Sequence, residues 1–183
     1  MIDGELLKGS VLSLLPEYRE RFVPLKPGTK RPAFDNWLTR GPYTLDEIVE
    51  LYRRGDFNVG LRVGNRLLVV DYESEETIAL VHSLGVPETP ISVLTHRCRH
   101  DYYQCLSEGK TKIKWRGMDC DIKRTGVVAA PATWRDDVSC RYVWRGRPVP
   151  ISELPVFPEE LLIEREEVRA HIATTLDLPD DRA

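Results

Sequence analysis

Cysteine is scarce in this chain of 183 residues, and its four cysteines include no C-x-x-C pair and form no dense framework. A secreted, disulfide-stabilised scaffold is therefore excluded. No apolar run approaches the roughly 18 residues that a membrane helix needs. The start at Met1 lacks the basic and apolar blocks of a signal peptide. We therefore expect a cytoplasmic protein with reduced thiols and no membrane partner.

Internal repeats and low-complexity tracts are also missing, and the composition is close to that of soluble globular proteins. Hydrophobic residues make up 42% of the chain and charged residues 30%, which excludes disordered and fibrous classes. The length suits one domain that can bury a core without disulfides or metals. We expect a main domain over residues 1–150, followed by an acidic helix and tail over residues 151–183.

The net charge of -3 hides an asymmetry along the chain. From Glu153 to the end there are 9 acidic and 3 basic residues, so the preceding part carries a positive balance. The stretch 97–124 holds 8 Lys or Arg against 4 Asp or Glu. This asymmetry is compatible with a polyanionic partner, although a solvated surface explains it equally well.

Hydrophobic periodicity and turn signals predict a helix, then strands, a helix, and mostly strands. Helices are expected at 5–20, between Thr44 and Gly55, at 75–84 and at 158–175. Thr44 and Glu47 have the spacing of a capping box, and Ser74 is suited to cap the third helix. Strands are expected from Phe22, at 57–63, 66–72, 91–95, 99–106, 118–123, 127–130 and 141–144, with a tight turn at Gly64-Asn65. The order indicates an α+β or mixed α/β fold.

Two acidic residues follow the apolar run 67–70, which is typical of a buried strand. Side chains alternate along a strand, so Asp71 and Glu73 point to the same face. Adjacent carboxylates repel each other unless a cation lies between them, and a divalent metal is the usual solution. The alternative is a strand end whose acids meet water.

A third carboxylate strengthens the metal hypothesis. In the segment 118–123, alternation places Asp119, Asp121 and Lys123 on one face. If this strand lies beside the first, acids from two strands converge into the oxygen-rich site that Mg²⁺ or Mn²⁺ prefers. Such a site can hold two metals for phosphoryl chemistry. The spacing alone does not establish that the strands are neighbours.

Between these strands lies the segment 95–103, in which Cys98, His100 and Tyr102 share a face. His100 could donate a hydrogen bond to a nucleoside triphosphate, with Arg97 or Arg99 adding charge. The alternative is a structural histidine beside solvated arginines.

Zinc is the competing metal in this region. His96, Cys98, Cys105 and Cys120 have suitable ligand types, but their spacing matches no standard zinc pattern. We therefore do not expect a zinc site.

Four segments occur in order over about residues 20–146: FVPLKPGTKRPAFDNW, FNVGLRVGNRLLVVDYE, RHDYY, and DIKRTGVVAAPATW followed by RYVW. Together they resemble the bifunctional DNA primase/polymerase (prim-pol) domain of the archaeo-eukaryotic primase superfamily, which is common on plasmids, viruses and other mobile elements. The ordered set is more specific than any single motif.

The resemblance implies a role for each matching residue. Asp71 and Glu73 match the D-x-D/E pair of the first motif, His100 the histidine of the second, and Asp121 the aspartate of the third. These four form the implied catalytic set, and the three acids are the implied ligands of two Mg²⁺ or Mn²⁺ ions. Asp119 is then the less favoured ligand.

The implied nucleotide-binding set is His100, Arg97, Arg99, Lys30 and Lys123. One departure concerns the second motif. Many family members have a glycine-rich turn there, with a small residue two before the histidine, whereas this chain has Arg97-Cys98-Arg99.

For the fold, the resemblance implies an RRM-like palm sheet joined to an N-terminal αβ unit, with the active site in the cleft between them. For the activity, it implies template-directed nucleotidyl transfer to a 3′-hydroxyl or to a first nucleotide. The implied partners are DNA template and primer and nucleoside triphosphates, with room for a helicase domain or partner. The basic stretch 110–116 is a further candidate for template phosphates.

Two other functions remain open from the residues. A nucleic-acid-binding or replication-initiation module could keep this fold without polymerising, and the Arg97-Cys98-Arg99 departure favours it. A two-metal nuclease would use the same carboxylates, but it explains His100 and Lys30 less well.

Overall fold

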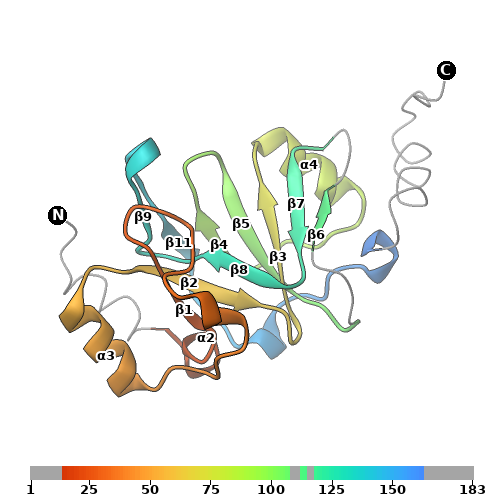
Figure 1. Ribbon diagram of the computed structural model, residues 1–183. Coiled ribbons are helices and arrows are strands. Elements are labelled where there is room, and N and C mark those ends of the chain that lie inside the picture. The colour runs from red at the N-terminus through yellow and green to blue at the C-terminus, as the bar shows by residue number, and fades with distance from the viewer. Residues whose placement is uncertain (1–13, 108–111, 115–117, 163–183) are drawn as a thin grey trace.

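The computed structural model describes residues 14–107, 112–114 and 118–162, and it shows an α+β protein with antiparallel sheets and few helices (Figure 1). The helical elements are α2 (Pro16–Arg19), η1 (Asp35–Leu38), α3 (Leu45–Arg54), α4 (Glu75–Ser83), η2 (Asp136–Val138), η3 (Ile151–Glu153) and η4 (Glu159–Leu162). The strands are β1 (Phe22–Leu25), β2 (Asn58–Val63), β3 (Leu67–Tyr72), β4 (Ile91–Leu94), β5 (Arg99–Gln104), β6 (Lys112–Lys114), β7 (Cys120–Lys123), β8 (Gly126–Ala129), β9 (Trp134–Arg135), β10 (Cys140–Arg141) and β11 (Val143–Gly146).

The strands form three antiparallel sheets. A three-stranded sheet has the order β1-β2-β8, and a six-stranded sheet has the order β11-β4-β5-β3-β7-β6. The third sheet is the small β10-β9 pair. β3 therefore lies inside the large sheet, between β5 and β7, although β4, β5 and β6 separate it from β7 along the chain.

The caps of the two longer helices confirm the sequence prediction. Thr44 Oγ1 accepts from the Glu47 backbone N–H at 3.2 Å, and the Glu47 carboxylate accepts from the Thr44 N–H at 2.8 Å, so the capping box opens α3. Ser74 caps α4 in the same manner, by accepting from the Thr77 N–H. α4 ends before Gly85, whose φ of +93° suits glycine.

Two predicted helices lie mostly outside the described residues. Of the helix expected over 5–20, the structure describes α2, and of the helix expected over 158–175 it describes the 3-10 turn η4. The basic stretch 110–116 and the acidic tail fall largely outside as well. No helix within the described ranges is long and apolar enough to cross a membrane.

The chain makes the expected tight turn at Gly64-Asn65, where the backbones of Gly64 and Leu67 exchange hydrogen bonds of 2.9 and 3.0 Å, but the strands on either side do not form a hairpin. Apart from a single bridge between Gly64 and Leu67, β2 pairs with β1 and β8, whereas β3 pairs with β5 and β7. Gly64, Asn65 and Arg66 all have positive φ, which turns the chain out of one sheet and into the other. The segment is a crossover between sheets.

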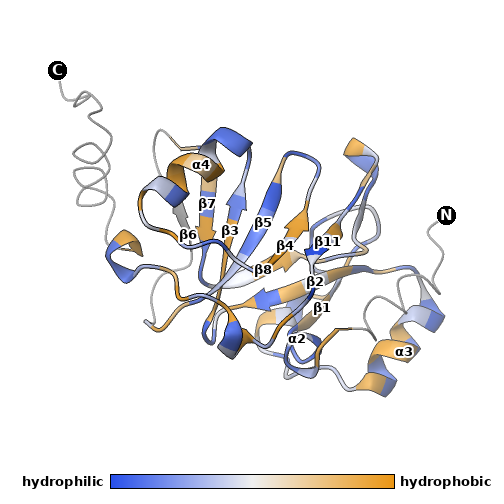
Figure 2. Ribbon diagram, turned by 180° about the vertical axis from the view of Figure 1, so that it is seen from behind, coloured by the Kyte–Doolittle hydropathy of each residue, from blue (hydrophilic) through white to orange (hydrophobic). Residues whose placement is uncertain are grey.

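The central strands β3 and β5 of the six-stranded sheet are buried on both faces. One face, with Val69, Val93 and Tyr102, shares a core with the three-stranded sheet. The other face, with Val70 and Ile122, packs with apolar residues of α4 and of the segment after η3. Figure 2 shows α4 lying over this second face. The side chain at each strand position therefore has one of two very different surroundings.

Gly60 offers a test of how closely β1, β2 and β8 pack. A Cβ at this position would lie 2.8 Å from side-chain atoms of both Leu25 and Val127 and 2.9 Å from the Val23 carbonyl oxygen. We expect Gly60→Ala to lower the free energy of unfolding in urea by about 1–3 kcal/mol, because the neighbouring strands must shift. Gly41→Ala is the matched control, since a Cβ at position 41 would meet nothing within 4 Å. Equal stability of the two variants would contradict this close packing.

Candidate active site

Three chemically active side chains form a row across the middle of the six-stranded sheet. Asp71 of β3 lies opposite His100 of β5 on one side and opposite Asp121 of β7 on the other. Residues directly opposite each other in neighbouring strands point to the same face. The condition for converging acids, that the strands of Asp71 and Asp121 be neighbours, is therefore met.

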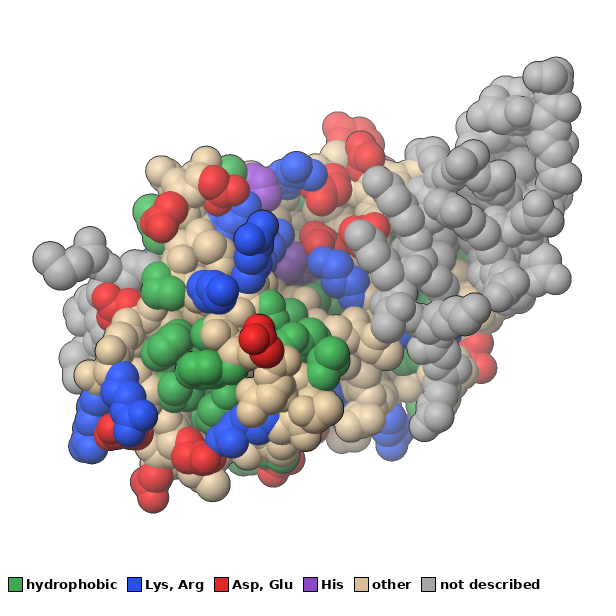
Figure 3. Space-filling model, in the orientation of Figure 1, with side chains coloured by type: hydrophobic (Ala, Val, Ile, Leu, Met, Phe, Trp, Pro, Cys, Tyr) green, Lys and Arg blue, Asp and Glu red, His purple; other side chains and the backbone are tan. Residues whose placement is uncertain are grey.

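The row lies where the shared core of the two sheets ends. Val69 precedes Asp71 by two residues and Tyr102 follows His100 by two, so both lie on the same face as the row, and both are fully buried in that core. Asp71 itself is 8% exposed and His100 1% exposed. Figure 3 shows basic, acidic and histidine side chains gathered over the upper part of this sheet. The polar row is thus a continuation of an apolar face.

β5 is the strand that brings most polarity into the sheet. Its sequence, RHDYYQ, is coloured hydrophilic along its length in Figure 2, yet five of its six residues are buried. Polar side chains are retained in a sheet interior only where partners satisfy them. On one face of β5 this polarity belongs to His100 beside Asp71, and on the other to the ion pair of Arg99 with Asp101.

Asp71 is held by two basic groups. Lys123 Nζ forms a short ion pair with Asp71 Oδ2, and His100 Nε2 lies 3.2 Å from Asp71 Oδ1. Burial by itself raises the pKa of the Asp71 carboxyl, but His100 and Lys123 outweigh this effect and hold the pKa well below its usual value. Asp71 is therefore a permanent anion at neutral pH.

Glu73 faces a different cation. Its carboxylate forms an ion pair with Arg97 Nη1 at 2.5 Å, and its backbone N–H donates to the Asp119 carbonyl oxygen at 2.9 Å. The Arg97 side chain is 60% exposed, and that of Glu73 is 31% exposed. An ion pair this exposed is weak, so Glu73 can exchange Arg97 for another cation at little cost.

Arg99 lies on the opposite face of the sheet from His100. It forms an ion pair with Asp101 at 2.9 Å, and the Asp101 side chain is completely buried. Arg99 precedes His100 directly in β5, and neighbouring residues of a strand point to opposite faces of the sheet. The structure therefore separates Arg99 from the row and pairs it with Asp101 instead.

Lys30 reaches the row from the loop after β1. Its Nζ lies 5.4 Å from the centre of the Tyr142 ring, and this ring makes an edge contact with His100 at 5.8 Å between centroids. Burial lowers the pKa of Lys30, while the charge of Asp71 raises it and that of Arg135 lowers it further. Lys30 is thus electrostatically coupled to the carboxylate row.

The structure adds Tyr142 and Arg135, which no local pattern in the sequence singles out. Tyr142 is fully buried, and burial raises its pKa to about 12, partly offset by the charge of Arg135. Burial also lowers the pKa of His96, as do the charges of Lys30 and Arg135. Tyr142 belongs to the RYVW segment that carries part of the family resemblance, but the spacing of that segment does not predict a contact with the row.

The carboxylates have the ligand type and the strand positions that a divalent metal needs, but their side chains are not arranged around a common point. Asp71, Asp121 and Glu73 offer only hard oxygen donors, which suit Mg²⁺ or Mn²⁺. Among the described residues, however, no three His, Cys, Asp or Glu side chains stand ready to hold a metal ion. The physical reason lies in the pairing above, because Lys123 and Arg97 engage two of the three acids.

The surroundings of Cys98 and Cys120 disfavour ionisation of their thiols. Burial raises the pKa of Cys98 to about 11, and the charge of Glu75 also raises it. Burial raises the pKa of Cys120 to about 12. Both groups are therefore thiols at neutral pH, and the expected absence of a zinc site stays a prediction.

The pairing of Asp71 with Lys123 can be tested without any activity assay. We expect Lys123→Met to lower the free energy of unfolding by about 3 kcal/mol, because it leaves a buried carboxylate with one basic partner fewer. In the double variant Asp71→Asn/Lys123→Met this loss should shrink, with a coupling energy of about 1–3 kcal/mol in urea unfolding. Strictly additive losses would show that the two side chains do not depend on each other.

Comparison with known proteins relates this chain to DNA primases and polymerases. The family model described as "Bifunctional DNA primase/polymerase, N-terminal" matches residues 16–157, a span that contains every member of the row. A search of curated proteins finds no match. Because the matched span covers well over half of the chain, the chain belongs to the Prim-Pol family of bifunctional DNA primase/polymerase N-terminal domains.

Proposed function

We propose that this protein is a metal-dependent DNA primase/polymerase that transfers nucleotidyl groups under the direction of a template. The observation that carries the proposal is the in-register row of His100, Asp71 and Asp121 on three adjacent strands. Family membership supports DNA primase and polymerase activity in general, and enzymes of this family are generally metal-dependent. In this proposal the row supplies the carboxylates and the histidine that nucleotidyl transfer would use.

The proposed reaction joins the oxygen of a 3′-hydroxyl to the α-phosphorus of a nucleoside triphosphate. The bond between that phosphorus and the leaving pyrophosphate breaks, and the hydroxyl loses its proton. Asp71, Glu73 and Asp121 would hold Mg²⁺ or Mn²⁺ ions, which lower the pKa of the attacking hydroxyl and neutralise charge on the phosphates. Negative charge on these acids is therefore required throughout.

The basic residues of the site have separate tasks in this proposal. Lys123 and His100 keep Asp71 ionised and fix its orientation, as their contacts indicate. Lys30 and Arg97 reach the row from two different loops and would bind the triphosphate oxygens by charge-assisted hydrogen bonds. Since the Arg97 pair is exposed, a triphosphate can draw Arg97 away and free Glu73.

The same proposal covers the arrangement of the chain. The six-stranded sheet would be the RRM-like palm, and β1, β2, β8 and α3 would form the N-terminal αβ unit, with substrates entering between them.

The catalytic unit over 1–150 stays a prediction. Phe157 and Leu161 are fully buried in the core beside α4, so the segment 151–162 is attached to that unit. DNA template, primer and nucleoside triphosphates are the proposed partners, in replication of a plasmid, virus or other mobile element.

Primer extension tests the proposal directly. We expect Asp71→Asn to lower incorporation by at least about 100-fold with either Mg²⁺ or Mn²⁺, because the anion at the centre of the row is lost. Asp119→Asn is the matched control, since it removes an exposed acid just before β7, and it should retain activity. Circular dichroism and urea unfolding of both variants separate a catalytic effect from a folding effect. Undiminished extension by folded Asp71→Asn would refute the assignment.

A non-catalytic nucleic-acid-binding module is the second candidate. The pairing of Asp71 and Glu73 with Lys123 and Arg97 favours it, because cations of the chain itself already neutralise two of the acids. Binding of template and primer without incorporation under both metals would select this function. Shortening of end-labelled DNA in the same assay would instead indicate a nuclease.

A further inference from the structure

A second polar region, a hollow of about 430 Å³, lies at the other end of β3 from Asp71. Its walls come from the β2–β3 connection at 64–66, the β7–β8 connection at 124–125 and the segment 105–107 that follows β5. The first two segments are the crossovers between the two larger sheets. Figure 1 shows the β2–β3 connection at the start of β3, whereas Asp71 is near its end. The hollow is therefore separate from the carboxylate row.

Four arginines line this hollow: Arg21, Arg62, Arg66 and Arg124. No aspartate or glutamate is among its lining residues. Within the part of the chain that the structure describes, none of the four forms an ion pair with a carboxylate. We call this hollow the arginine pocket, and its lining gathers positive charge without a carboxylate among the described lining residues.

Neutral acceptors hold the four guanidinium groups in place. Arg21 donates to two carbonyl oxygens of the β2–β3 connection at 2.6 and 2.7 Å, and Arg62 donates to carbonyl oxygens in and just after η1. Arg66 donates to a glutamine oxygen of β5 at 3.0 Å, and Arg124 to a backbone oxygen after β5 at 2.7 Å. Each guanidinium has five N–H donors, so these bonds orient the groups without exhausting or neutralising them.

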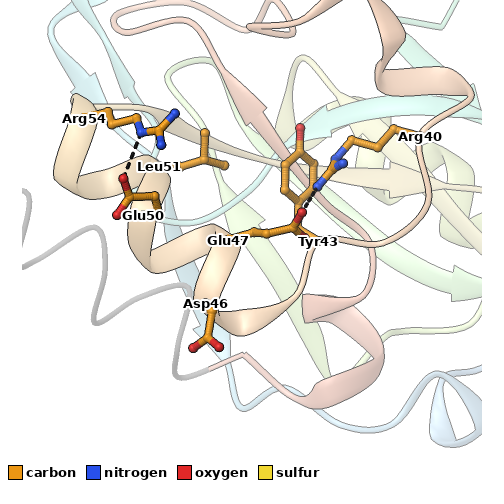
Figure 4. A pocket seen from close by; sticks show the side chains of 7 residues that line it. All are labelled: Arg40, Tyr43, Asp46, Glu47, Glu50, Leu51 and Arg54. Atoms are coloured by element: carbon orange, nitrogen blue, oxygen red, sulfur yellow. Dashed lines mark hydrogen bonds and ion pairs between the residues drawn. The ribbon is translucent and has the colours of Figure 1, made fainter.

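A hollow along α3 shows the contrast (Figure 4). It also contains arginines, but Arg40 pairs with Glu47 and Arg54 pairs with Glu50. Its charges are therefore balanced within the hollow, and the group of side chains is self-sufficient. The arginine pocket has no such balance.

Burial makes the missing counter-charge costly. Arg124 is 9% exposed, and a buried cation is expensive unless an anion accompanies it. Burial lowers the pKa of Arg21, the charges of Glu17 and Glu20 raise it, and the charge of Arg62 lowers it by less. An anion in the pocket would relieve this crowding of positive charge. The planar donor fork of arginine matches the oxygens of phosphate best.

We propose that the arginine pocket binds a phosphate group, and that a nucleic acid strand on the same domain supplies it. Leu67 lines the pocket and Asp71 lies four residues further along β3, which corresponds to about 13 Å. About four stacked nucleotides of one strand cover that distance. The pocket uses none of the acids of the row, so it can exist whether or not the protein polymerises.

Binding of a labelled single-stranded oligonucleotide, followed by fluorescence anisotropy over a range of salt concentrations, tests the proposal. Arg66 is the exposed member of the pocket, so Arg66→Ala should leave the fold intact. We expect its affinity at about 0.1 M salt to fall about fivefold, and the slope of log affinity against log salt to shrink by about 0.7, as one phosphate contact is lost. Arg53→Ala in α3 makes the same change in net charge and should behave like the unmodified protein.

A thermal-shift comparison of sodium phosphate with sodium chloride at equal ionic strength identifies the source of the phosphate. Weaker oligonucleotide binding in Arg66→Ala supports the strand. Stabilisation of the unmodified protein by phosphate that disappears in Arg66→Ala, with oligonucleotide binding unchanged, supports phosphate chemistry but overturns the strand as its source. No effect in either measurement overturns the pocket altogether. None of these readouts involves nucleotide incorporation, so they are independent of the Asp71→Asn test.

Discussion

The carboxylate of Asp71, buried in the middle of a sheet and held between Lys123 and His100, is the constraint on which the site depends. A buried anion is tolerable only where cations or hydrogen-bond donors accompany it, and here Lys123 and His100 come from the strands on either side. β5, β3 and β7 must therefore keep one register with respect to each other. A shift of any one strand by a single residue would turn its polar side chain to the wrong face.

The position of this row follows from the two-sheet architecture. The face that carries it is apolar where the three-stranded sheet covers it and polar where that cover ends. The apolar part anchors β3, β5 and β7 rigidly, and the polar part projects from that anchored surface. Sites built on strands supported in this manner hold their geometry better than sites on loops. Only the outer cations, Lys30 and Arg97, come from loops, which suits groups that must follow a substrate.

The carboxylate row and the arginine pocket share a structural origin. The chain passes between the sheets at the β2–β3 and β7–β8 connections, and both crossovers lie at the same end of β3. Arg21 donates to two carbonyl oxygens of the β2–β3 crossover, and Arg124 of the β7–β8 crossover donates to a carbonyl oxygen after β5. The same need for hydrogen bonds thus brings positive charge to one end of β3, while the acids gather at the other. A polyanion that spans both ends meets a basic anchor and a site suited to metals.

The amino-acid sequence determined the local features of this protein: the capping box at Thr44 and Glu47, the cap at Ser74, most strand positions, and the shared face of Asp71 with Glu73 and of Asp121 with Lys123. These depend on neighbours within a few residues, so alternation and capping rules suffice for them. Only the tertiary structure decided that β3 lies between β5 and β7 and that the turn at Gly64-Asn65 leads into a second sheet. It also decided that Tyr142 lies against His100, whereas Arg99 lies on the face of the sheet opposite Asp71. Those outcomes depend on contacts between segments far apart in the chain, whose pairing and register are set by the burial of whole faces and not by any local pattern.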